Sequence, residues 1–189
     1  MCMKKLCALF LMPVFAGCLT SAIPPPTYWP VSYLGPKAKA EVAKYGVARA
    51  MPVIVRSPYA ASAVAVLRSD GTIAFDPLNE FAATPANLIR GVFMDAMSAS
   101  GLFREVVGTS SIATADVSVE VNVEKLVLDC SREGQRTAVV EIDLKILRQH
   151  AIVASVRGRG TADAADGKFG AAFSSAFGSA FVTAFAQLR

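Results

Sequence analysis

The sequence predicts an α+β domain: an antiparallel sheet with two helices packed on one face. Three stretches between residues 116 and 156 alternate apolar with polar residues, which is the period of strands that have one buried face. Residues 84–101 and the C-terminal segment instead carry apolar side chains at helical spacing. Such strands and helices bury their apolar sides most simply as a sheet layer under a helix layer.

Residues 1–17 form a predicted secretory leader. Lys4 and Lys5 give a positive start, residues 6–15 are an apolar run too short to span a bilayer, and small residues precede Cys18. This pattern resembles a bacterial lipobox, in which the cysteine thiol receives acyl chains such as palmitate and the leader is removed. The motif therefore predicts lipidation at Cys18, with an ordinary cleaved leader and an incidental cysteine as the alternative.

Residues 18–46 are predicted to hold the lipidated cysteine and a Pro-rich tether. Five prolines favour an extended course of the chain: Pro24, Pro25, Pro26, Pro30 and Pro36. Three aromatic residues indicate that part of the tether docks on the domain: Tyr28, Trp29 and Tyr33. Residues 37–44 are predicted to make one or two helical turns that end at Gly46.

The domain proper is placed at residues 47–189 and opens with short strands. Residues 53–55 and 63–67 favour strands, and Ser57-Pro58 favours a turn between them. Asp70-Gly71 then predicts a hairpin turn into a further short strand.

The first helix is predicted to begin at Thr84-Pro85 and to end at Gly101. Threonine is favoured as an N-cap, proline at the first helical position and glycine just after the last turn. The apolar residues between them share one broad face: Leu88, Ile89, Val92, Phe93, Ala96 and Met97. The segment is long enough for about four turns, close to the usual length of a helix.

The most regular strand is predicted over residues 116–130. Its valines alternate with polar residues up to Glu124, after which the apolar parity shifts to Leu126, Leu128 and Cys130. A one-residue slip would turn the whole buried face to solvent, so a bulge is predicted at Glu124-Lys125.

Two further strands are predicted to follow in an antiparallel meander. A turn at Glu133-Gly134 leads into alternating residues 138–146, and a tight reversal at Gln149-His150 leads into 152–156.

A second helix is predicted at the C-terminus, where phenylalanine recurs every four residues: Phe169, Phe173, Phe177, Phe181 and Phe185. Each step of four advances the stripe by about 40° around a helix of 3.6 residues per turn, as suits a helix crossing a twisted sheet. We interpret the stripe as core-facing. Contact between its outer part and a partner subunit or an acyl chain is the alternative.

Composition argues against several classes of function. The formal net charge is +4, and Lys4 and Lys5 of the leader contribute two of these charges, so the mature domain is near neutral. A nucleic-acid binder would instead show a concentrated basic face. Loss of the leader and acylation of Cys18 would leave Cys130 as the one free thiol, so no internal disulfide is expected. One such thiol and one histidine cannot supply four zinc ligands, and neither a metal nor a cofactor is predicted.

No residue pattern points to catalysis, so the protein is not expected to be an enzyme. His150, the single histidine, falls at a predicted turn, and no nucleophile elbow surrounds the serine pairs. Cys130 has inward parity and is interpreted as a buried, inert thiol. Four acidic residues are interpreted as solvated charges, with a catalytic carboxylate pair as the alternative: Glu120, Glu124, Glu141 and Asp143.

A family resemblance rests on a series of short motifs: Tyr33-Leu34, Pro52-Val53-Ile54, Ser57-Pro58-Tyr59, residues 63–67, Asp70-Gly71, Phe75-Asp76, Asn79-Glu80-Phe81-Ala82, Pro85, Leu88 and Ser100-Gly101-Leu102-Phe103. From Tyr28 to Arg189 the chain resembles the ABC-type transport auxiliary lipoproteins, which are partners of lipid-transport systems built on MCE-domain proteins. Phe81 stands where members of that family usually have tryptophan.

The resemblance implies a lipid-anchored domain on the periplasmic face of the outer membrane, where it binds an MCE-domain protein of an ABC transport system. Leu19 agrees with this location, because an aspartate there retains many lipoproteins at the inner membrane. Lipid binding and a homo-oligomeric form are further expectations. Two other classes of function stay open: a scaffold for envelope assembly or stability without a transport role, and an envelope hydrolase, for which no motif is present.

Overall fold

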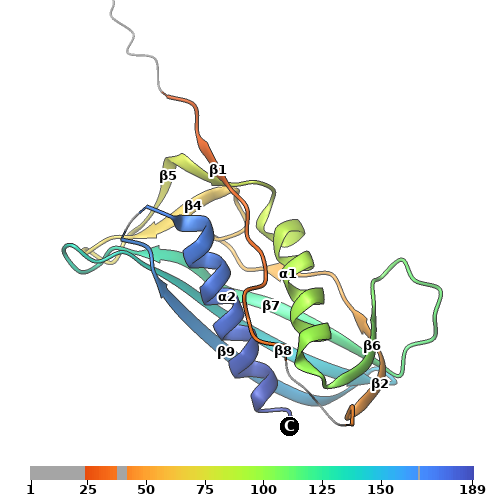
Figure 1. Cartoon of the computed structure of the whole chain (residues 1–189). Coiled ribbons are helices and arrows are strands. Elements are labelled where there is room, and N and C mark those ends of the chain that lie inside the picture. Colours follow the sequence, from red (N-terminus) through yellow and green to blue (C-terminus); the bar gives the residue numbers. More distant parts are fainter. Residues whose placement is uncertain (1–23, 38–41, 166) are drawn as a thin grey trace, which may run out of the picture.

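The computed structural model describes residues 24–37, 42–165 and 167–189. Over these residues the chain forms an α+β domain in which a nine-stranded sheet carries two helices (Figure 1). The elements are, in chain order, β1 (Thr27–Trp29), β2 (Tyr45–Ala50), β3 (Ile54–Val55), β4 (Ala63–Leu67), β5 (Ile73–Phe81), α1 (Pro85–Ser100), β6 (Phe103–Val107), β7 (Val117–Asp129), β8 (Thr137–Arg148), β9 (Ala151–Asp163) and α2 (Phe169–Ala186).

The sheet is mixed, which corrects the prediction of an antiparallel sheet. Strands β7, β8 and β9 form the predicted antiparallel meander. On its other side β7 pairs in parallel with β2, β3 and β4 in succession, while β1 lies parallel to β5 and β2 parallel to β6. A parallel pair needs a crossover connection, and α1 lies in the segment that separates β7 from each of its three parallel partners.

The predicted bulge in β7 is confirmed. Pairing with β8 shifts register between Val123, which faces Ile142, and Lys125, which faces Glu141, so Glu124 is the extra residue. The shift keeps the apolar residues on both sides of it buried, as the change of parity in the sequence required. Both predicted turns of the meander are present, and Gln149 and His150 adopt φ values of 49° and 69° in the second.

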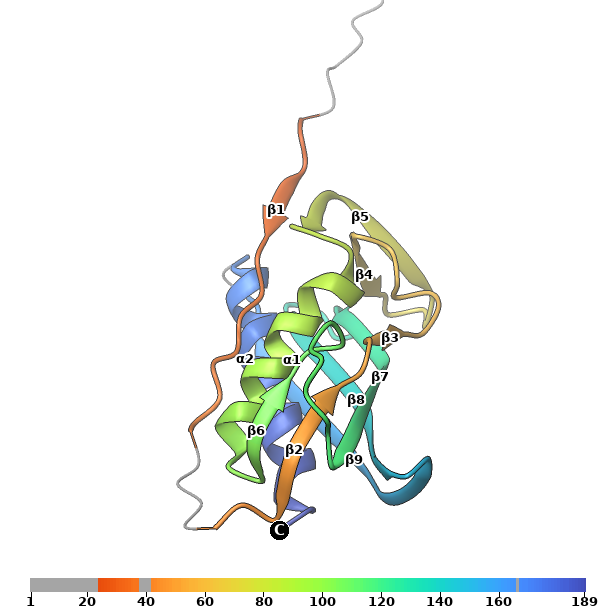
Figure 2. The ribbon, with the colours of Figure 1, turned by 90° about the vertical axis from the view of Figure 1, so that its right-hand side faces the viewer.

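Both helices lie against the same face of the sheet, as predicted (Figure 1, Figure 2). Helix α1 begins with Pro85 and ends before Gly101, whose φ of 67° is the left-handed conformation that glycine adopts readily. Thr84 precedes α1 as predicted, but its side chain makes no capping hydrogen bond. Packing on α2 and the sheet therefore stabilises α1 more than its N-cap does.

The phenylalanine stripe of α2 faces the core, as we interpreted it. All five rings are buried at 5% exposure or less, beside four buried alanines. Phe181 stacks on Phe93 of α1, with 5.7 Å between ring centroids, and Phe173 meets Phe81 of β5 edge to face. Within the described residues α2 is also the one helix with the length and apolar composition of a membrane span, but most of it is buried inside this domain.

Several strands differ from the predictions: β1 was not expected, and β5 runs to Phe81 where a short strand was expected to end at Phe75. Residues 44–46 were expected to close a helical turn, but Tyr45 and Gly46 open β2; residues 38–41 lie outside the described part. Strand β6 has no alternating pattern that would predict it, and β9 continues well beyond residue 156 through Gly158 and Gly160. Glycine normally weakens a strand, and here α2 packs directly on these two positions.

Candidate functional site

Cys18, the single residue to which we assign a function, lies outside the described residues. The described chain begins six residues later, at Pro24, and reaches the sheet as β1. Residues 27–35, which we name the strap, run in extended form across the helices before the chain continues toward β2 (Figure 2). Our expectation that part of the tether docks on the domain is confirmed.

Polar contacts fix the start of the strap to β5. The Trp29 Nε1 atom donates a hydrogen bond to Asn79 Oδ1 at 2.8 Å, and the Ala82 amide donates to the Trp29 oxygen at 2.9 Å. The Trp29 ring meets Phe169 edge to face, with 5.7 Å between centroids. Trp29, Val31 and Tyr33 pack on the core, and burial raises the pKa of the Tyr33 phenol.

Three small residues of α2 receive the strap: Gly170, Ser174 and Gly178. The Ser174 hydroxyl accepts a hydrogen bond from the Ser32 amide at 3.0 Å and donates one to the Gly170 oxygen at 2.7 Å. A Cβ atom at Gly170 would lie 2.7 Å from the Pro30 oxygen, so only a glycine lets the strap approach this closely. The strap is therefore seated in a surface shaped for it.

The space between α2 and the sheet is filled. A Cβ atom at Gly158 or Gly160 of β9 would overlap the backbone oxygen of Ala180 or Ala176. Among the described residues, this contact leaves no room for a lipid chain between α2 and β9, where an apolar groove would have been the simplest lipid site.

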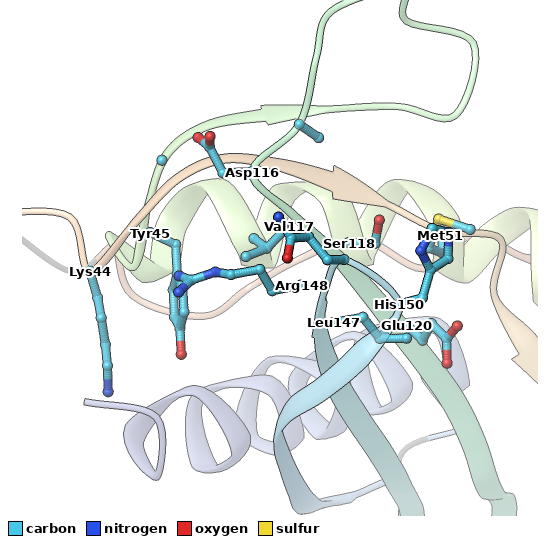
Figure 3. A pocket seen from close by; sticks show the side chains of 13 residues that line it. Lys44, Tyr45, Met51, Asp116, Val117, Ser118, Glu120, Leu147, Arg148 and His150 are labelled. Carbon is cyan, nitrogen blue, oxygen red and sulfur yellow. The ribbon is translucent and has the colours of Figure 1, made fainter.

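An open pocket of about 760 Å³ lies at the end of the sheet that holds the β8–β9 turn (Figure 3). Arg148 extends toward Tyr45 at one end of the pocket, and His150 and Glu120 lie at the other. The Asp116 carboxylate, a further lining group, accepts a hydrogen bond from the Val47 amide at 2.7 Å and thus has a structural role. Within the described residues no cluster of three metal-ligating side chains occurs here or elsewhere.

A loop beside this pocket, residues 108–116, is held by Arg49, a role that we did not predict. The Arg49 guanidinium donates to four loop carbonyls, the shortest bond being 2.6 Å to the Ala113 oxygen. The loop presents Ile112 fully to solvent. An isolated arginine in a short strand gives no sequence signal for such a role.

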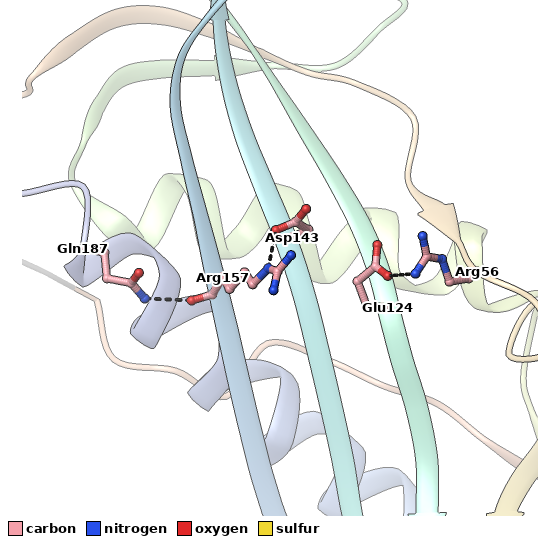
Figure 4. A network of polar contacts seen from close by, with 5 residues as sticks. All are labelled: Arg56, Glu124, Asp143, Arg157 and Gln187. Atoms are coloured by element: carbon pink, nitrogen blue, oxygen red, sulfur yellow. Dashed lines mark hydrogen bonds and ion pairs between the residues drawn. The ribbon is translucent and has the colours of Figure 1, made fainter.

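Three of the four acidic residues form ion pairs with arginines on the face of the sheet opposite the helices, and Figure 4 shows two of these pairs. The fourth, Glu120, lies opposite Lys145 in the sheet. The ion-pair distances are 2.5 Å for Arg56–Glu124, 3.3 Å for Arg157–Asp143 and 3.6 Å for Arg159–Glu141. Such exposed pairs contribute about 0–1 kcal/mol each. This arrangement fits solvated surface charges better than a catalytic carboxylate pair.

Cys130 is half-buried and packs against the core. Burial raises the pKa of its thiol, and the nearby carboxylates of Asp129 and Asp76 raise it further, while Arg136 lowers it. The thiol is therefore protonated at neutral pH, which agrees with our interpretation of an inert cysteine.

No protein-family model matches the chain, and no curated protein matches its sequence significantly. Solved structures do resemble it. Protein XCC0632 from Xanthomonas campestris, of the family DUF330, has a TM-score of 0.64 and 16% identity over 85% of this chain and 91% of that one. This likeness shows a shared fold.

Two other solved structures are less similar. A PelC dodecamer from Paraburkholderia phytofirmans has a TM-score of 0.43 and 13% identity, over 80% of this chain and 90% of that one. A candidate lipoprotein from Caulobacter crescentus CB15 has a TM-score of 0.34 and 18% identity, over 55% of this chain and 76% of that one.

Proposed function

We propose that the protein is an accessory lipoprotein, anchored through Cys18 on the periplasmic face of the outer membrane, that serves an ABC/MCE-type lipid transport system by binding a partner protein. The leader and the residues before Cys18 support the anchor. The motifs between Tyr33 and Phe103 support the transport system. The protein is proposed to act by binding, not by catalysis.

The docked strap carries the proposal furthest. Because the strap begins at Thr27, only residues 18–26 separate the acylated cysteine from the domain. A fully extended chain covers 3.3–3.6 Å per residue, so the point where the chain joins the domain stays within about 30 Å of the membrane. Such a domain suits a partner that comes up to the outer membrane, as a protein bridging the two membranes would.

The polar groups of the domain support binding over catalysis. Among the described residues, His150 stands exposed at a turn, and Glu124, Glu141 and Asp143 pair with arginines. A general base needs a nucleophile within hydrogen-bond reach, and no hydrogen bond in this part of the chain joins His150 to one. The charged sheet face offers a protein partner a polar surface.

The partner is the decisive test. The native lipoprotein would be crosslinked in intact cells, purified from the outer membrane and its captured proteins identified by mass spectrometry, with Cys18→Ser as the unanchored control. We expect an MCE-domain protein that is captured by the native form and much less by the control. Capture of outer-membrane assembly proteins alone would favour the scaffold. Turnover of an envelope lipid that His150→Ala abolishes would contradict a binding role.

A further inference from the structure

Four large apolar side chains are exposed on the wing of the sheet formed by β1, β5 and β4: Tyr28, Ile73, Phe75 and Leu78, which we name the wing patch. Their exposed fractions are 60%, 37%, 45% and 39%. Ile73 and Phe75 face Leu67 and Ala65 across the β4–β5 pair. Ala65 packs with Val127 and Val139 on the face of the sheet that the helices leave open, so Ile73 and Phe75 are on that face too.

Tyr28 is placed on the same open face, because it is the register partner of Glu80. Leu78 lies between Phe75 and Glu80, in the part of β5 where the pairing with β4 shifts register. Glu80 in turn faces Ala63, which alternates with Ala65 and shares its face. The wing patch is therefore one apolar area at one end of this face.

Most of the remainder of the open face is charged, with Ile152 as an exposed apolar side chain at its far end. Across β7, β8 and β9 it carries the Arg157–Asp143 and Arg159–Glu141 pairs, and Glu120 opposite Lys145. Apolar side chains gathered at one end of a charged face mark a contact surface.

We infer that the wing patch rests on the lipid bilayer that holds Cys18; this inference deepens the proposed function and depends on its lipid anchor. The described chain enters the domain at the wing itself, since Tyr28 belongs to both β1 and the patch (Figure 1). The nine residues from 18 to 26 cannot carry the wing farther than about 30 Å from the acylated cysteine. The anchor thus brings this apolar surface, and not the pocket end, to the membrane.

The charges beside the patch indicate which lipids it meets. From β4 to the end of β5 the chain carries three acidic residues, Asp70, Asp76 and Glu80, and one basic residue, Arg68. A surface built for anionic lipids would carry a cluster of lysines or arginines. The wing therefore fits zwitterionic headgroups, with its apolar side chains at the boundary of headgroups and acyl chains.

The test uses the acylated full-length protein in vesicles of phosphatidylethanolamine and phosphatidylcholine with brominated acyl chains, which quench tryptophan that touches them. Trp29 is the only tryptophan. Trp29→Phe therefore removes the native tryptophan fluorescence, and Phe75→Trp then supplies the one tryptophan that is measured. The matched control is Ile152→Trp, exposed at the β8–β9 turn. Through strand pairing, Ile152 lies level with Ser118 of β7 and Phe75 lies level with Val127. The two positions are therefore about 30 Å apart along β7, at 3.3 Å per residue.

We expect the Phe75→Trp protein to lose most of its fluorescence and the Ile152→Trp protein to keep it. Equal quenching at both positions, or at neither while the protein stays on the vesicles, would overturn the wing contact and leave the anchor intact. Failure of the acylated protein to bind vesicles at all would instead overturn the proposed function.

A second measurement avoids substitutions. In the unaltered lipoprotein, backbone amides of residues 73–81 should exchange hydrogen more slowly on vesicles than in detergent, while those at the β8–β9 turn stay unchanged. In the unacylated Cys18→Ser form, the wing patch should not join two copies of the protein. A dimer of that form that Phe75→Ser separates would show that the patch joins two copies, and would contradict the inference.

Discussion

Two glycines of β9 decide how closely α2 approaches the sheet. Gly158 and Gly160 face the backbone oxygens of Ala180 and Ala176, where no side-chain atom fits. The same glycines hid the second half of β9 from prediction, because glycine is rare inside strands. Glycine is required at both positions because α2, which packs across them, leaves no room for a Cβ atom.

Gly158→Ala should therefore destabilise the domain. The added methyl group overlaps the Ala180 backbone oxygen, and overpacking of a core costs about 1–3 kcal/mol. Gly91→Ala is the matched control, since nothing lies within 4 Å of its Cβ position on the exposed face of α1. Alanine there should raise the free energy of unfolding by up to about 1 kcal/mol. Urea denaturation of both variants measures the two effects, and shifts in the same direction would contradict this packing.

Cys130 should react slowly with iodoacetamide. In a mature chain with Cys18→Ser it is the one thiol, and its raised pKa keeps the thiolate fraction low at pH 8. The alkylation rate of the folded protein should rise at a higher pH than that of the urea-unfolded chain. Stability should also fall as the pH rises past the ordinary thiol pKa, because the unfolded chain ionises first. A folded-state profile that coincides with the unfolded one would show that burial does not shift the thiol.

Among the elements, the strap is held in three ways: β1 pairs with β5, the Trp29 ring contacts Phe169, and the chain crosses small residues of α2. Its inward residues alternate along an extended chain, and α2 offers small residues at the positions that it crosses. From the sequence, three aromatic residues in a proline-rich tether were enough to predict docking. The groove in α2 was not predictable, since Gly170, Ser174 and Gly178 read as neutral residues of an apolar helix.

Trp29→Ala should loosen the strap without unfolding the domain. The change removes the hydrogen bond to Asn79 and the contact with Phe169, and we expect a cost of about 2–3 kcal/mol for a half-buried ring. Hydrogen exchange at the Ala82 amide, which donates to the Trp29 oxygen, should become faster. Trp29→Phe keeps the ring and should change this exchange much less. Unaltered exchange in Trp29→Ala would show that the ring does not hold the strap.

Long periodic elements were predicted well, and short ones only in part. The alternation in β7 and β8 runs over enough residues to fix both the strands and the bulge, and Pro85 and Gly101 marked the ends of α1. Strands β3 and β4 lie where residues 53–55 and 63–67 predicted them, but β2 and β6, of six and five residues, show no period. Their parallel pairing with β7 or with each other depends on the crossover through α1, which local sequence does not encode.

For the whole molecule, the anchor and the wing patch together define an orientation. Cys18 could be assigned from its neighbours in sequence, because the processing signal is local. The wing patch could not, because Tyr28 shares a face with Phe75 only when β1 pairs with β5 and β5 with β4. In the orientation that we propose, the domain turns its wing to the membrane and its pocket end away from it.

The mass of the mature N-terminus, measured on protein from the native envelope, decides whether Cys18 anchors the domain. We expect a chain that begins at Cys18 and carries acyl chains on that residue. We also expect Cys18→Ser to yield a folded protein in the soluble fraction. A free thiol at residue 18, or a leader still attached to the exported protein, would contradict this anchoring.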